Sequence, residues 1–153
     1  MKRNGITNCE FQCGDLNKIW ELYNLFEQRE GVDVLITDPN RPGLHPILKN
    51  WMLCLGARRI VYVSCNPTSL ARDCAQLCET PLSENFDNDY NTSDVYKARL
   101  AKLNYTYKLS SLQLVDMFPH TTHIEAIAVL DRVPKEPKLR RDLPRRLPIP
   151  TPQ

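Results

Sequence analysis

The sequence predicts an α/β fold with an open, mostly parallel sheet and an antiparallel strand near its end. Strand and helix signals alternate along the first half of the chain, an order that is typical of a parallel sheet. Two more strand signals then follow, joined by a short loop. The 153 residues, 42% of them hydrophobic, are enough for one folded domain with a core.

The elements follow from hydrophobic periodicity and from turn residues. We expect strands at residues 9–13, 32–37, 59–64, 105–115 and 124–131, and helices at residues 16–30, 46–55 and 66–79. The run at 32–37 is nearly all apolar, as in a parallel strand that is buried on both faces. Residues 80–104 are polar and predict a surface insertion with at most one short helix, near residues 95–103.

Residues 1–133 form the predicted folded unit, and residues 134–153 form a tail of different composition. The tail holds six of the twelve prolines and six Lys or Arg against two acidic residues. We expect it to be disordered. It could bind phosphate groups as a nonspecific arm, or it could be only a solvated appendage.

The other compositional signals concern location and metals. No apolar run approaches the length of a membrane span, and the first residues lead into no signal-peptide core, so we expect no membrane association and an intracellular protein. Cytoplasm, nucleus and organelle all remain open.

The six cysteines lack disulfide-framework spacing, and core packing explains the pairs Cys9/Cys13 and Cys74/Cys78 better than a metal site.

Cys65 is the strongest chemical candidate. Residues 60–67 read Ile-Val-Tyr-Val-Ser-Cys-Asn-Pro, a strand that runs directly into a helix. Asn66 and Pro67 suit the N-cap and the first turn. Cys65 would then lie near free N–H groups, whose partial positive charge favours a thiolate. The local pattern fits a small buried residue at a strand end equally well.

Several polar residues should converge with Cys65. In open parallel sheets, ligands bind beyond the carboxyl ends of the strands. Asp38 follows one predicted strand, and Cys65 follows the next. An antiparallel closing strand would begin on the same side, bringing His123 and Glu125 to that edge.

Three motifs resemble the signatures of the RNA uracil-5-methyltransferases, which make 5-methyluridine in transfer and ribosomal RNA with S-adenosyl-L-methionine. They are Asp38-Pro-Asn-Arg-Pro-Gly-Leu44, Val63-Ser-Cys-Asn-Pro67 with Leu70-Ala-Arg-Asp73, and Val115-Asp-Met-Phe-Pro-His-Thr-Thr-His-Ile-Glu125. The resemblance covers residues 4–130. It implies the carboxyl-terminal part of a Rossmann-like class I methyltransferase domain that lacks the first two strands.

The resemblance also implies roles for individual residues. Cys65 matches the nucleophile that adds to C6 of uracil, and Glu125 matches the base that removes the C5 proton. Asp38 and Asp15 match positions near the cofactor, and Arg41 matches a residue beside the target nucleotide. His123, like His120, would orient the base or the RNA.

The sequence departs from the family upstream of residue 4. The family's glycine-rich cofactor loop and the acidic residue after its second strand have no counterpart, and none of the five glycines lie close together. Two hypotheses follow. The chain could be a methyltransferase portion that acts with an amino-terminal half from another polypeptide, or it could be a noncatalytic remnant that binds RNA or a protein partner.

Overall fold

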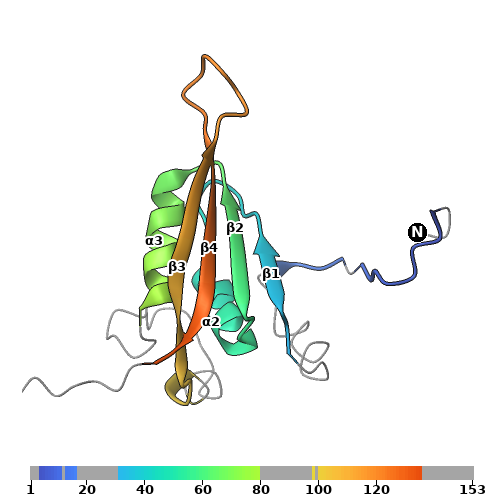
Figure 1. Ribbon diagram of the computed structural model, residues 1–153, viewed down its shortest axis with the longest axis vertical. Helices are drawn as coiled ribbons and strands as arrows, with labels where there is room; N and C mark the ends of the chain where they lie inside the picture. Colours follow the sequence, from blue (N-terminus) through green and yellow to red (C-terminus); the bar gives the residue numbers. More distant parts are fainter. Residues whose placement is uncertain (1–3, 12, 17–30, 80–97, 99, 136–153) are drawn as a thin grey trace, which may run out of the picture.

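The predicted α/β architecture is present in the computed structural model, which describes residues 4–11, 13–16, 31–79, 98 and 100–135. The elements are β1 (Val34–Thr37), α2 (Pro46–Leu55), β2 (Arg59–Ser64), α3 (Pro67–Cys78), β3 (Tyr105–Val115) and β4 (Glu125–Pro134). The strand order is β1-β2-β4-β3 (Figure 1). β1 and β2 are parallel, whereas β4 is antiparallel to both β2 and β3. The antiparallel closing strand is therefore confirmed.

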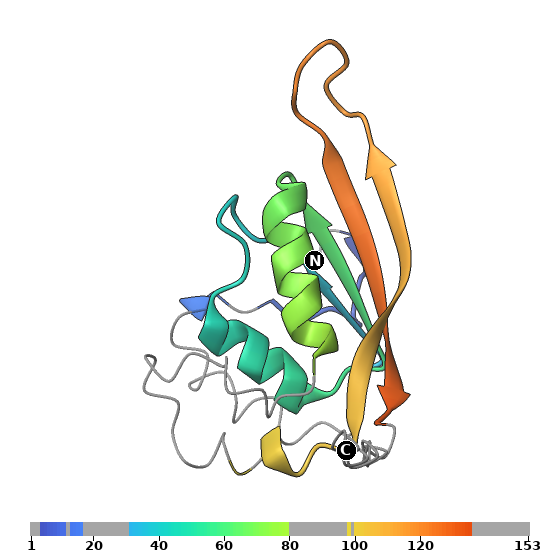
Figure 2. The same cartoon turned by 90° about the vertical axis from the view of Figure 1, so that its left-hand side faces the viewer.

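Helices α2 and α3 pack on one face of the sheet, and the core lies between the two layers (Figure 2). Alternate residues of the central strands point into this core, as the strand period of two requires. Small side chains on β4 leave room for the helices. The fully buried residues on these strands are Ile60, Tyr62, Ala126, Ala128 and Leu130.

Local capping sets where both helices begin. In α3, the Asn66 side chain accepts a hydrogen bond from the Thr68 amide at 3.1 Å, and Pro67 occupies the first turn. In α2, His45 caps the start, and Gly56 ends the helix in the left-handed conformation (φ 65°). These caps explain why the sequence predicted both helices to within a residue.

The strand expected at residues 9–13 is not formed. Cys9, Glu10, Phe11 and Cys13 are exposed and belong to no strand, and the Phe11 side chain is 79% exposed. A short alternating run needs a neighbouring strand to hydrogen-bond with. Within the described residues, the edge of β1 away from β2 carries no such strand.

The expected burial of β1 on both faces is also wrong. Val34 and Ile36 are 50% and 69% exposed, because α2 and α3 cover only the other face and no helix covers this one in the described ranges. β1 is two residues shorter than expected, although Arg58 and Arg59 still donate backbone hydrogen bonds to residues 32 and 33.

β3 and β4 form a long hairpin whose tip projects beyond the rest of the sheet (Figure 1). β3 has the predicted bounds. β4 extends to Pro134 rather than to residue 131, because Tyr105 and Thr106 supply partners for Pro134 and Val133. Of the predicted insertion, Ala98, Leu100 and Ala101 are helical, and Leu100 is buried.

Other predictions fall outside the described residues: most of the helix at 16–30, the body of the insertion, and the tail from residue 136. None of the helices in the described segments is long and apolar enough to cross a membrane.

Candidate active site

Three chain segments lie at one end of the sheet, where β1 and β2 finish and β4 begins. This end is the edge meant wherever the site is described below. β1 and β2 are parallel, so Asp38 and Cys65, which follow them, leave the sheet on the same side. β4 is antiparallel to β2 and begins on that side with Glu125. The convergence predicted for Asp38, Cys65, His123 and Glu125 is therefore a consequence of the strand directions.

The backbone register brings Cys65 and Glu125 level with each other. Ser64 pairs with Ala126 in the antiparallel ladder, so the next position along the two strands sets Cys65 opposite Glu125. Both side chains are half-buried. A thiol and a carboxylate facing one region at the end of a sheet can serve as nucleophile and base toward one substrate.

Arg41 and His123 join two of the segments directly. Arg41 Nη2 lies 3.0 Å from His123 Nδ1, although 82 residues separate them. Arginine has only donors, so His123 accepts through Nδ1 and leaves Nε2 to carry the ring proton. Both side chains are exposed, which leaves them accessible to a ligand at this edge.

The two predicted cofactor contacts differ in their placement. Asp38 is exposed immediately after β1, at the same edge as Cys65. Asp15 is exposed in the segment 13–16, where no strand holds it at this edge. Its role as a cofactor contact stays a prediction.

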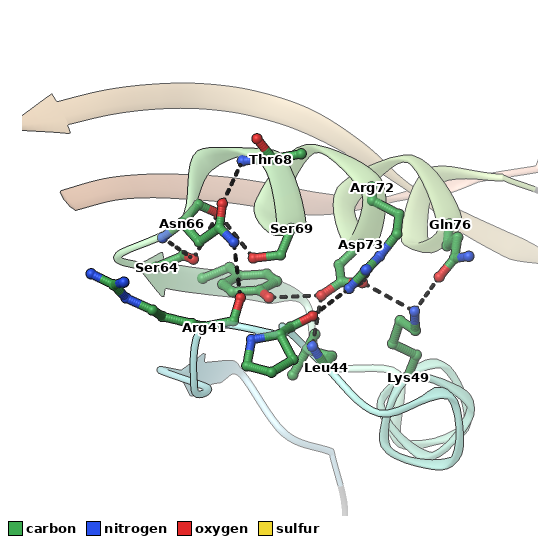
Figure 3. A network of polar contacts seen from close by, with 12 residues as sticks. Arg41, Leu44, Lys49, Ser64, Asn66, Thr68, Ser69, Arg72, Asp73 and Gln76 are labelled. Carbon is green, nitrogen blue, oxygen red and sulfur yellow. Dashed lines mark hydrogen bonds and ion pairs between the residues drawn. The ribbon is translucent and has the colours of Figure 1, made fainter. Parts of the chain in front are cut away.

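Residues 38–44, here called the Arg41 loop, are held by a polar network that the sequence did not reveal (Figure 3). At its centre is Asp73 on α3, which is fully buried. One carboxylate oxygen accepts from the Leu44 amide at 2.7 Å and from the Tyr62 hydroxyl at 2.8 Å, and the other accepts from Lys49 Nζ at 3.0 Å. Arg72 also donates to this second oxygen at 3.1 Å.

The charge of Asp73 is maintained by these partners. Burial alone would raise the pKa of Asp73, but the hydrogen bonds from Leu44, Tyr62 and Lys49 outweigh it and lower that pKa. Burial and the bond to Asp73 in turn raise the pKa of Tyr62. The network is therefore an anionic acceptor surrounded by four donors. The sequence carried one overlooked signal, a carboxylate on the apolar face of α3 beside Cys74.

The cysteines of the helices act as core residues. Cys74 is buried, and desolvation raises its pKa to about 12. Desolvation likewise raises the pKa of Cys54 to about 11 and that of Cys78 above its usual value. The packing interpretation of Cys74 and Cys78 is confirmed, whereas Cys9 and Cys13 are exposed. The described residues contain no group of three His, Cys, Asp or Glu that could hold a metal ion.

A dinucleotide-type cofactor cradle needs a glycine at which the backbone approaches the ligand closely. Gly43 does not serve this purpose, because a Cβ atom there would lie 2.3 Å from Asp73 Oδ2, so the chain's own side chains fill the space. Gly5 and Gly31 face open space at separate places. Among the glycines of the described residues, none is therefore seen to form such a cradle, and the role of Asp38 as a cofactor contact stays a prediction.

The geometry defines an α/β protein that carries a thiol, a carboxylate and an arginine–histidine pair at one sheet edge. No family model matches the chain. The 23S rRNA (uracil(1939)-C(5))-methyltransferase RlmD of Tolumonas auensis is 34% identical over 131 residues, which are 86% of this chain and 24% of that protein. An uncharacterized RNA methyltransferase of Halalkalibacterium halodurans is 38% identical over 128 residues, 84% of this chain and 22% of that protein.

Among solved structures, the chain is similar to the Pyrococcus abyssi tRNA (uracil-54, C5)-methyltransferase in complex with S-adenosyl-L-homocysteine. The identity is 35% and the TM-score 0.45, and the match covers 66% of this chain and 18% of that one. The sequence identity to the Tolumonas protein makes the chain homologous to RNA (uracil-C5)-methyltransferases over most of its length. It spans about a quarter of the length of the curated relatives it matches.

Proposed function

We propose that this chain carries the nucleophile, the base and part of the RNA-binding surface of an RNA (uracil-C5)-methyltransferase. The substrate would be a uridine in ribosomal or transfer RNA. One observation supports this most directly: the ladder between β2 and β4 sets Glu125 opposite Cys65, in a chain homologous to enzymes with this name.

The proposed chemistry needs both residues in turn. The Cys65 thiolate adds to C6 of uracil, which makes C5 nucleophilic. S-adenosyl-L-methionine, when bound, supplies the methyl group that C5 acquires. The carboxylate of Glu125 then removes the C5 proton, and the Cys65–C6 bond breaks to regenerate the thiolate. Arg41 and His123 would bind the target nucleotide beside these groups.

Binding of the cofactor requires more than the described residues. Asp38 and Asp15 are the proposed cofactor contacts on this chain. The rest of the cradle would come from a further segment, in the same or another polypeptide, that extends the sheet from the edge of β1 that pairs with none of the described strands. The further segment would also have to cover the face of β1 on which Val34 and Ile36 are exposed. We expect the 153 residues alone to be a poor methyltransferase.

Trapping with RNA that contains 5-fluorouridine tests the proposal. Fluorine at C5 cannot be removed as a proton, so a competent site stays covalently attached to the RNA. The chain would be incubated with this RNA and S-adenosyl-L-methionine. A parallel reaction would also contain the part of the Tolumonas relative that precedes the region matched by this chain. We expect a denaturation-resistant adduct that is lost in Cys65→Ala and kept in Cys9→Ala, since Cys9 is exposed but outside the site.

Glu125→Gln separates the addition of Cys65 to C6 from the removal of the C5 proton by Glu125. With ordinary uridine RNA, this variant should accumulate the adduct, because addition by Cys65 needs no carboxylate at residue 125 whereas release does. If no adduct forms with wild type under any of these conditions, catalysis by this chain is disproved.

A noncatalytic role is the second candidate, and the lack of a glycine cradle among the described residues favours it. In that case the chain would bind RNA through the Arg41 and His123 edge without reacting. RNA affinity that falls in Arg41→Ala, together with failure of the trapping experiment, would identify this role.

A further inference from the structure

The Arg41 loop is attached to the start and the body of α3 through two neighbouring backbone carbonyls, those of Arg41 and Pro42. Asn66 Nδ2 donates to the carbonyl of Arg41 at 3.0 Å. Arg72 Nη2 donates to the carbonyl of Pro42 at 2.6 Å. The loop is therefore held at its middle, through two neighbouring carbonyls, by the N-cap residue of α3 and by a side chain of the same helix (Figure 3).

Asp73 supplies the third attachment. It accepts the Leu44 amide, and it is itself held by Lys49 of α2 and by Tyr62 of β2. Both carboxylate oxygens are occupied, so Asp73 cannot rotate without losing hydrogen bonds in a buried site. The attachment thus links the loop to both helices and to the strand that ends at Ser64.

The loop also carries Arg41, which is proposed to bind the target nucleotide. Arg41 contacts His123, which stands two residues before Glu125. A displacement of the loop would therefore shift Arg41 relative to both Cys65 and Glu125. Misplacement of reacting or binding groups by about 1 Å can lower a rate by about 100-fold.

We propose that Asn66, Arg72 and Asp73 are positioning residues that hold the Arg41 loop at a fixed spacing from Cys65. The inference rests on the proposed function for its catalytic consequence, but the attachment itself can be measured without any reaction. None of the three needs to touch the substrate.

Asn66→Ser is the most informative variant. Serine keeps a neutral oxygen that can cap α3, but it has no amide nitrogen to reach the Arg41 carbonyl. Helix stability should therefore stay close to wild type while the loop loses one attachment. Asn66→Ala, which loses both the cap and the attachment, shows how much of any effect comes from the helix end.

Arg72→Met provides an independent variant, because the Arg72 side chain is 54% exposed and its replacement opens no cavity in the core. Arg72→Lys keeps the charge beside Asp73 and should recover part of the effect. Arg58→Met is the matched control, since Arg58 is an exposed arginine that pairs with Asp33 at the other end of the sheet.

Two readouts decide the inference in the full chain. Hydrogen exchange at the Leu44 amide should accelerate about tenfold in Asn66→Ser and Arg72→Met. The ¹⁵N shift of His123 Nδ1 should also change, although neither variant touches His123. A merely structural role would alter neither the His123 signal nor the exchange rate in a variant that is as stable as wild type.

In trapping assays that succeed with wild type, the same variants should slow adduct formation about tenfold at saturating RNA, with RNA affinity nearly unchanged. Unchanged His123 shifts and Leu44 exchange in both variants would overturn the positioning role. If wild type forms no adduct but the His123 shifts change in the variants, the proposed function is refuted and the attachment of the loop is established.

Discussion

At the scale of single residues, Gly43 and Asp73 depend on each other. Gly43 adopts φ +89°, and Asp73 Oδ2 occupies the space that a side chain at residue 43 would need. The carboxylate can approach the loop backbone closely only because that side chain is absent. The glycine thereby permits the hydrogen bond to Leu44.

Gly43→Ala should destabilise the protein by about 1–3 kcal/mol, through backbone strain and displacement of the carboxylate. Denaturant unfolding measures this effect. Gly31→Ala is the control: Gly31 also has a positive φ but faces open space, so only the conformational cost of about 1 kcal/mol should remain. Equal losses in the two variants would mean that the close contact with Asp73 is unimportant.

At the scale of the elements, the sequence predicted best where local signals decide. The boundaries of α2 and α3 follow from caps and prolines, and those of β2 follow from a short β-branched and aromatic run. The segment at 9–13 has a strand pattern, yet strand formation depends on a partner that no local pattern specifies. The burial of β1 failed for the same reason, because it depends on which other layers cover the sheet.

β1 carries two exposed apolar side chains, Val34 and Ile36, and its outer edge pairs with none of the described strands. Such an edge promotes association between chains. Ile36→Lys should reduce concentration-dependent self-association in sedimentation velocity. Met117→Lys removes an equally exposed side chain from the hairpin tip and should leave association unchanged. If Met117→Lys has the larger effect, association occurs through the hairpin instead.

At the scale of the whole molecule, strand order predicted where most of the site residues lie. It did not predict the contacts that hold the Arg41 loop beside them. Strand direction carries Asp38, Cys65, His123 and Glu125 to one edge, whereas Arg41 was expected there only from the family resemblance. The roles of Asn66, Arg72 and Asp73 depend on contacts between α3 and a loop about 30 residues away in sequence, as in the separation of Leu44 from Asp73. Periodicity marks Asp73 only as a charged residue on an apolar face.

Asp73 should make the fold sensitive to acid. Its pKa is lowered in the folded state, so its contribution to stability is present above the unfolded value of about 3.9 and is lost as the pH falls through the folded value. Asp73→Asn should cost about 3–5 kcal/mol at neutral pH, because Lys49 stays buried without its anion.

Urea unfolding from pH 7 down to pH 2 tests this prediction. The stability of Asp73→Asn should fall less steeply below pH 4 than that of wild type. Asp33→Asn, which changes an exposed carboxylate, should follow the wild-type profile. Parallel profiles for wild type and Asp73→Asn would show that the charge of Asp73 is not linked to folding.

The central place of β4 has a consequence for how the chain is made. β4 lies between β2 and β3 although it follows both in the chain, so a ribosome releases its neighbours first. Cys65 therefore emerges well before Glu125, the residue that the ladder sets opposite it. The proposed pairing of thiol and carboxylate would be complete only late in synthesis, when β4 inserts beside β2 and closes the sheet.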